Sequence, residues 1–295
     1  MLIDELRDQP IFLCGHPKSG TSLLRSLLDA HPQLLVYPEE TVFFRRYLPL
    51  AKDQTLDQQL ALAERYLIHI FTWNQTNPPS SQAGFPDRDY SAISFDDIRR
   101  RMAGLINEWG CRHAGDLLSA AILAYGQVTG QVSDQTLGLV EKTPYNERYV
   151  GVMNAWWPKA KYIHIVRDPR DNYLTYRRKH PDWTPEIFTT SWNHSTRLGF
   201  ENQQLLGADR YWILRYEDLV LQPVETISKL IAFLCIQDHP TLRIPTRNGV
   251  AWQGNSMFTE RFEGISGSAV ERWRRSLSNE DSGVIQLVSG KYILG

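Results

Sequence analysis

The sequence predicts an α/β protein in which a parallel sheet carries helices on both faces. Two observations support this prediction. Short apolar runs of strand length alternate with helical patterns along most of the chain. The first of these runs also ends in a glycine-containing turn that leads directly into a helix. The chain has 295 residues, and we expect a single domain over residues 1–295 with a helical insertion at about 51–135.

Residues 10–32, PIFLCGHPKSGTSLLRSLLDAHP, hold the first strand, turn and helix. Unpaired N–H groups at the helix start and the helix dipole make such a turn an anion site. Gly15 and Gly20 have the spacing of a nucleotide-binding P-loop, so the sheet is expected to be P-loop-like. However, Thr21 stands where an ATPase carries lysine, and Lys18 lies inside the turn instead. The anion is therefore expected to differ from the β,γ-phosphate of ATP with Mg²⁺.

A second strand is predicted at residues 34–37, and two adjacent carboxylates, Glu39 and Glu40, follow it. An equally good interpretation is an acidic pair that complements the dipole of a helix start. Residues 51–135 then show helical spacing, with a polar break at 78–89. We expect this insertion to help shape a binding pocket, and its candidate lining residues are Trp73, Phe85 and Trp109.

Two further strands are predicted at residues 137–140 and 161–166, and each ends beside basic residues. Lys142 follows the first, and ligands bind at the carboxyl ends of parallel strands. Arg167 follows the second, and its planar guanidinium suits a phosphate, with Thr175 two turns into the next helix. The alternative is a turn in which neighbouring aspartates simply pair the arginines. Two anion sites at neighbouring strand ends predict a ligand with two separated anionic groups.

The remaining elements follow the same alternation. A helix is predicted at 185–206, a strand at 211–216 and a helix at 223–235, which begins at Pro223. Residues 238–262 are rich in loop formers, and a loop of small residues then leads into a basic helix within 265–275.

Composition excludes several classes of function. The net charge is −1 and the isoelectric point about 6.7, so no global basic field favours nucleic acid or an anionic membrane. No apolar run reaches membrane-spanning length, and residues 1–10 lack the pattern of a signal peptide. The three cysteines lack metal-ligand spacing. We expect a cytoplasmic protein without metal, and the oligomeric state cannot be predicted.

Four segments resemble sulfotransferases that use 3′-phosphoadenosine-5′-phosphosulfate (PAPS). Residues 17–22, PKSGTS, are similar to the 5′-phosphosulfate loop of that family, and 166–175 to its 3′-phosphate motif, with Thr175 at a position usually held by serine. Residues 215–219, RYEDL, and 266–273 resemble segments that close over the nucleotide. The sequences LLDAHP, EET and KTP at 27–32, 39–41 and 142–144 are similar to the bacterial and tyrosylprotein branch.

The resemblance implies roles for individual residues. PAPS would be the co-substrate, 3′-phosphoadenosine 5′-phosphate (PAP) the product, and no metal is needed. In this branch the glutamate before the threonine is the general base, which indicates Glu40, while Glu39 stays a candidate. Lys18 and Lys142 would stabilise the transition state. The residues implied in nucleotide binding are Lys18, Ser19, Gly20, Thr21, Ser22, Arg167, Thr175, Tyr216, Ser266 and Arg272.

The expected function is therefore transfer of a sulfuryl group from PAPS to a hydroxyl by in-line displacement. The acceptor is expected to be a small molecule, a carbohydrate or a peptide. Two alternatives are a P-loop small-molecule kinase that uses ATP-Mg²⁺ and a catalytically silent PAP-binding protein.

Overall fold

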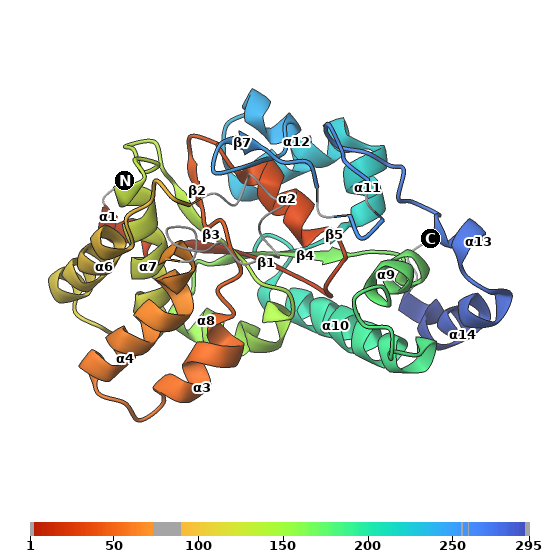
Figure 1. The fold of residues 1–295 in the computed structure, drawn as a ribbon, viewed down its shortest axis with the longest axis horizontal. Coiled ribbons are helices and arrows are strands. Elements are labelled where there is room, and N and C mark those ends of the chain that lie inside the picture. Colours follow the sequence, from red (N-terminus) through yellow and green to blue (C-terminus); the bar gives the residue numbers. More distant parts are fainter. Residues whose placement is uncertain (1–2, 73–89, 255, 259, 293–295) are drawn as a thin grey trace.

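The computed structural model describes residues 3–72, 90–254, 256–258 and 260–292 (Figure 1). Five strands form a parallel sheet with the order β2-β3-β1-β4-β5, which confirms the predicted fold class. The strands are β1 (Pro10–Cys14), β2 (Leu34–Val36), β3 (Gly138–Lys142), β4 (Lys161–Val166) and β5 (Tyr211–Arg215). Strand β1 is central, and its Leu13 pairs with Lys142 of β3 and with Ile163 of β4. The carboxyl ends of these three strands therefore lie side by side.

Helices cover both faces of the sheet (Figure 1). Side chains of a strand point alternately to its two faces, so Ile11 and Leu13 share one core with α2 (Thr21–Leu28), α11 (Tyr216–Leu221) and α12 (Pro223–Leu234). Phe12 and Cys14 belong to the opposite core, with α7 (Gly115–Val128) and α8 (Val150–Trp156). Near-continuous burial of β1 and β3 follows from this two-sided packing.

The described part of the insertion is helical, as predicted. It contains α4 (Leu56–Ala63), a π-helix (Glu64–Ile68), a 3₁₀ turn (His69–Thr72), α6 (Phe95–Trp109) and α7. Helix α7 is buried along most of its length because it lies between the sheet and α6. Trp109 packs against this core, with the Arg7 guanidinium 5.1 Å from its ring centroid. Trp73 and Phe85 lie outside the described residues.

A third core joins α9 (Pro169–Tyr176), α10 (Pro185–Leu206) and α14 (Asn279–Ser289) around Phe188 and Trp192. The other short elements are α1 (Ile3–Leu6), a π-helix (Phe43–Tyr47), α3 (Leu48–Ala51), the hairpin β6 (Thr246–Arg247) and β7 (Val250–Ala251), α13 (Trp273–Ser276), and 3₁₀ turns at Asn146–Tyr149, Pro240–Arg243 and Gly290–Tyr292.

Three predicted boundaries differ from the structure. The third strand continues to Lys142, because Glu141 and Lys142 both point into buried surroundings. The fifth strand ends at Arg215, and Tyr216 already begins α11. The predicted basic helix is confined to α13, and the residues before it form turns.

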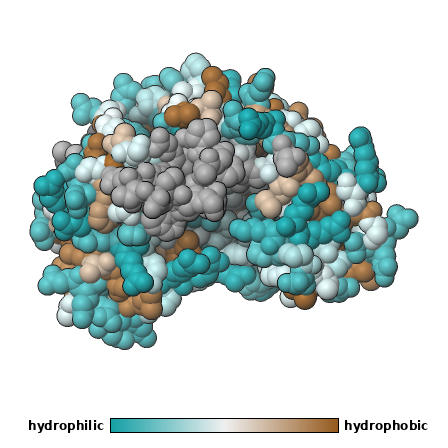
Figure 2. All heavy atoms as spheres, viewed as in Figure 1, coloured by the Kyte–Doolittle hydropathy of each residue, from teal (hydrophilic) through white to brown (hydrophobic). Residues whose placement is uncertain are grey.

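Hydrophilic side chains predominate on the face shown in Figure 2, and hydrophobic ones occur in small groups. Among the described residues, no helix combines the length and the apolar character that crossing a bilayer requires.

Candidate active site

The first turn passes close to two neighbours, and this explains its glycines. Gly15 has φ 127°, and a Cβ there would lie 2.3 Å from the Ile165 carbonyl oxygen of β4. Gly20 has φ 104°, and a Cβ there would lie 2.5 Å from the Tyr216 ring. Only glycine fits at such positions. The turn is therefore fixed between β4 and Tyr216, immediately before α2.

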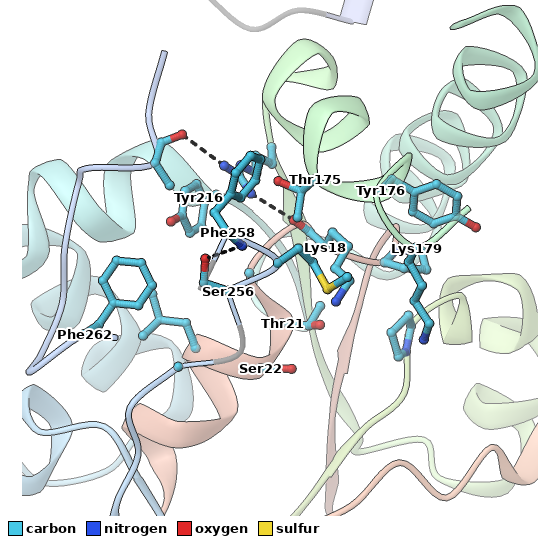
Figure 3. A pocket seen from close by; sticks show the side chains of 18 of the residues that line it. Lys18, Thr21, Ser22, Thr175, Tyr176, Lys179, Tyr216, Ser256, Phe258 and Phe262 are labelled. Atoms are coloured by element: carbon cyan, nitrogen blue, oxygen red, sulfur yellow. Dashed lines mark hydrogen bonds between the residues drawn. The ribbon is translucent and has the colours of Figure 1, made fainter. Parts of the chain in front are cut away.

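A cavity of about 510 Å³ opens over this turn (Figure 3). In Figure 3, Tyr216, Phe258 and Phe262 lie on one side of Lys18, and Tyr176 and Lys179 lie on the other. Ten residues implied by the sequence line the cavity: Lys18, Gly20, Thr21, Ser22, Glu40, Arg167, Thr175, Tyr216, Ser266 and Arg272.

Arg167 joins the two strand-end turns. Its guanidinium donates to the Lys18 carbonyl oxygen at 3.2 Å and to the Ala269 carbonyl oxygen at 3.1 Å, and lies 4.5 Å from the Tyr216 ring centroid. The residue is buried, and its Nε has no partner among the described residues. The alternative aspartate pairing applies to Arg170 instead, because Asp168 accepts from its Nε and Nη2.

Residues 266–273 are held over the cavity by Asp171. Its buried carboxylate accepts the backbone N–H groups of Glu271 at 2.7 Å and Trp273 at 2.8 Å. Burial raises the pKa of Asp171 to about 6, although Arg167 and the N–H groups oppose this. Arg272 reaches back across this segment, where it pairs with Glu260 at 2.6 Å and lies 4.4 Å from the Phe258 ring centroid.

Ser19 is placed differently from its neighbours in the turn. Its side chain is fully buried, accepts from the Asn172 amide at 2.6 Å and is not part of the cavity wall. Ser19 thus ties the first turn to α9. Thr175 lines the cavity, and its hydroxyl donates to the Asp171 carbonyl oxygen at 3.0 Å.

Glu40 lines the cavity and forms an ion pair with Lys142, with 2.5 Å between Oε1 and Nζ. Lys142 itself is buried behind Glu40 and is not part of the cavity wall. Burial alone would raise the pKa of Glu40, but Lys142, together with Lys179 and Arg25, offsets this effect and lowers the pKa of the carboxyl. Burial lowers the pKa of the Lys142 ammonium, and Glu40 opposes this shift. Burial also lowers the pKa of Lys18, with a contribution from Lys179. The paired lysine therefore keeps Glu40 ionised and able to accept a proton.

Glu39 points to a different environment from Glu40. It accepts a hydrogen bond from the Tyr90 hydroxyl at 2.6 Å and lies 3.8 Å from the Arg247 guanidinium. Its side chain is 15% exposed, against 45% for Glu40, and it does not line the cavity. Of the two candidates, only Glu40 lines the cavity.

Sequence reasoning missed Glu141, which orders the loop that carries Glu40. Its buried carboxylate accepts from the hydroxyls of Thr41 at 2.7 Å and Thr143 at 2.6 Å, and from the Asn146 amide at 2.8 Å. Burial raises its pKa. The sequence held one signal for this role, namely a carboxylate next to an apolar strand run. A buried charge needs hydrogen-bond partners, so such a residue predicts a local polar network.

Several other lining residues were also missed, because no sequence motif marks them. These include Phe258 and Phe262, on the Tyr216 side in Figure 3, and Trp252. The others are Tyr176 and Lys179, on the opposite side in Figure 3, and Arg45, Arg46 and Tyr145. None of the described residues of 51–135 lines the cavity. The described helices of that insertion pack on the core instead.

Cys14, Glu147 and His164 form a buried cluster beneath the turn, with ligand atoms within 4.8 Å of one another. This spacing could hold a metal ion, which sequence spacing did not suggest. The same atoms make protein contacts: Glu147 accepts from the Gly15 N–H at 3.0 Å and the Ser195 hydroxyl, and His164 bonds the Tyr211 hydroxyl at 2.8 Å. The hydrogen bonds of this cluster hold the end of β1 and the start of the turn.

Comparisons with known proteins identify the family and the fold of this chain. Residues 10–240 match a family model described as "Sulfotransferase family". A protein-tyrosine sulfotransferase from Drosophila melanogaster is 24% identical over 236 residues, which is 77% of this chain and 38% of that protein. An omega-hydroxy-beta-dihydromenaquinone-9 sulfotransferase from Mycobacterium bovis is 24% identical over 260 residues, covering 79% of this chain and 64% of that protein. The chain thus spans between 38% and 64% of the length of these two relatives.

Two solved structures share the fold over almost their whole length. The sulfotransferase domain of the Synechococcus PCC 7002 olefin synthase aligns with a TM-score of 0.54 and 21% identity, covering 98% of this chain and 97% of that one. The sulfotransferase domain from the curacin biosynthetic pathway aligns with a TM-score of 0.52 and 18% identity, covering 95% and 97%.

Proposed function

This chain belongs to the sulfotransferase family, and from its cavity we propose that it transfers the sulfuryl group of PAPS to an acceptor hydroxyl. One observation carries the proposal. Two strand-end turns that suit anions open into one cavity, which Lys18, Arg167 and Glu40 line, and the buried Lys142 pairs with Glu40. A nucleotide with anionic groups at its 5′ and 3′ positions fits that arrangement.

The proposed nucleotide orientation follows from the charges. The N–H groups and hydroxyls at the start of α2, with Lys18, would hold the 5′-phosphosulfate. Arg167, Thr175, Ser266 and Arg272 would hold the 3′-phosphate, because the guanidinium groups can form paired hydrogen bonds with its oxygens. The aromatic rings of Tyr216, Phe258 and Phe262, which lie on one side of the cavity, would contact the adenine.

In the proposed reaction, Glu40 accepts the proton of the acceptor hydroxyl. The acceptor oxygen forms a bond to sulfur as the bond between sulfur and the 5′-phosphate oxygen breaks, and PAP leaves with that electron pair. Lys18 and Lys142 stabilise the negative charge that develops on the sulfuryl and bridging oxygens. The Glu40 ion pair supports this role, since it places an ionised base beside a buried ammonium.

The acceptor would enter from the side of Tyr176 and Lys179. Lys179 lies on that side, and Arg45 and Arg46 also line the cavity. No ion pair of these three side chains is found among the described residues. A small-molecule or peptide hydroxyl compound with a nearby negative charge would therefore suit this entrance. The preference for a negatively charged acceptor can be tested by comparing matched alcohols with and without a carboxylate.

Two measurements test the proposal. We expect PAP to raise the melting temperature, and ATP with Mg²⁺ to leave it nearly unchanged; the reverse result would favour a kinase. Incubation with ³⁵S-labelled PAPS and pools of phenols, alcohols, sugars and tyrosine peptides should yield a labelled product. PAP binding without transfer to any pool would indicate a catalytically silent PAP-binding protein.

A further inference from the structure

Tyr145 lies in the cavity wall three residues after Lys142, at the end of β3. Its backbone is left-handed, with φ 71°, and its N–H donates to the Gly15 carbonyl oxygen at 3.1 Å. A tyrosine in this conformation is strained, and it persists only where the surroundings determine it. The surrounding contacts, such as the hydrogen bond to Gly15, therefore hold Tyr145 in place at the turn that carries Lys18, despite the strain.

The hydroxyl of Tyr145 has a defined hydrogen-bond direction. His16 Nδ1 lies 3.0 Å from the Pro17 carbonyl oxygen, which can only accept, so Nδ1 carries a proton. Burial lowers the pKa of His16 to about 4, so the ring is neutral near pH 7 and its Nε2 is an acceptor. Tyr145 therefore donates to Nε2 at 3.1 Å, and Ser191 donates to Tyr145 at 3.1 Å.

The ring of Tyr145 is fixed as well. The Arg148 guanidinium lies 4.4 Å from its centroid, and the His16 ring meets it edge-on at 5.4 Å. The hydroxyl of Tyr176, which also lines the cavity, interacts with the Tyr145 hydroxyl. The hydroxyl of Tyr145 is used by His16 and Ser191. The part of this side chain that a ligand could contact is therefore its aromatic ring.

We propose that Tyr145 is the acceptor-positioning residue of this site, and that its ring, held by His16 and Ser191, selects acceptors with an aromatic ring next to the reacting hydroxyl. This inference rests on the proposed sulfuryl transfer. The hydrogen bond from Tyr145 to His16 links the acceptor wall to the turn that would hold the donor, so the two substrates are aligned by one rigid unit.

The test compares two primary alcohols of similar acidity, benzyl alcohol and cyclohexylmethanol, with labelled PAPS. We expect the wild type to prefer benzyl alcohol in kcat/KM by about 2- to 12-fold, the effect of one aromatic pair. Tyr145→Leu should remove this preference. Tyr145→Phe should keep the preference but raise the KM for benzyl alcohol more than it lowers kcat. The thermal shift by PAP should be unchanged in both variants.

Tyr66→Leu is the matched control, because Tyr66 packs on the helical core away from the cavity. It should keep the wild-type ratio. The inference is overturned if Tyr145→Leu retains the preference, if it loses the PAP shift, or if the wild type labels pool acceptors but shows no preference between the two alcohols. Absence of a PAP shift in the wild type would instead overturn the proposed function.

Discussion

At the scale of single residues, the site depends on two adjacent glutamates with different surroundings. Glu39 contacts Tyr90 and lies near Arg247, whereas Glu40 pairs with Lys142 and faces the cavity. Both residues lie in the bend and loop that follow β2, where no regular strand alternation fixes which side chain turns toward the cavity. Their partners, contributed by distant parts of the chain, decide which one.

Replacement of Glu40 by glutamine tests the base. We expect Glu40→Gln to lower kcat by about 10²- to 10⁴-fold, the usual contribution of a general base. The affinity for PAP should stay within about threefold, because Glu40 is proposed to contact only the acceptor. The value of kcat is measured with labelled PAPS and an acceptor, and the affinity for PAP is measured by calorimetry.

Glu39→Gln is the matched control. It weakens the contacts with Tyr90 and Arg247, so it should lower the free energy of unfolding and leave most of kcat. Full activity in Glu40→Gln together with a large loss in Glu39→Gln would show that the assignment of the base is wrong.

At the scale of elements, one carboxylate on α9 holds the segment that leads into α13. Asp171 accepts two backbone N–H groups from this segment, while Arg170 lies 3.9 Å from the Trp273 ring centroid. Residues 266–273 contain few large apolar side chains, so these polar contacts take the place of a core. The position of Ser266 and Arg272 at the cavity therefore depends on α9.

Asp171→Ala should release this segment. Hydrogen bonds to a charged acceptor contribute about 1.5–3 kcal/mol each, so we expect PAP affinity to fall by roughly 10-fold or more. Hydrogen exchange should show faster exchange at the Glu271 and Trp273 amides. Asp281→Ala, which removes a pair with Arg177 at 3.2 Å, is the control and should change neither value. Unchanged PAP affinity in Asp171→Ala would contradict the anchoring role.

At the scale of the whole molecule, stability depends on histidines that are buried in neutral form. Burial lowers the pKa of His164 to about 3. Its unfolded value is about 6.5, so below that pH the unfolded chain binds a proton that the folded protein does not. The stability associated with this neutral histidine is therefore present above pH 6.5 and is lost as the pH falls.

His164→Asn should remove this pH dependence. The difference in unfolding free energy between wild type and variant should shrink by about 1.4 kcal/mol per pH unit below pH 6.5, because only the wild type carries the buried imidazole. Urea unfolding between pH 7.5 and 4.5 measures it. His194→Gln, at an exposed position, should show a much smaller change. A constant difference for His164→Asn across this range would refute the interpretation.

The sequence predicted most of the fold because local patterns encode it. Apolar runs gave all five strands, and helical spacing gave α2, α10 and α12 at nearly their observed bounds. Gly15, Gly20 and Lys18 indicated an anion-binding turn, because turn chemistry is written in a few consecutive residues. The boundaries of β3 and β5 were less accurate, since the burial of Lys142 and the helical start at Tyr216 depend on packing partners.

The sequence by itself therefore determined the parallel sheet, the two basic strand ends and the family resemblance. Only the tertiary structure decided that Glu40 rather than Glu39 faces the cavity, that Glu141 orders its loop, and that Tyr145 stands over the turn. Local patterns depend on neighbours along the chain. The direction of a polar side chain depends on hydrogen-bond partners elsewhere in the chain. Thr41 and Glu141, for example, are 100 residues apart and meet only when the chain has folded.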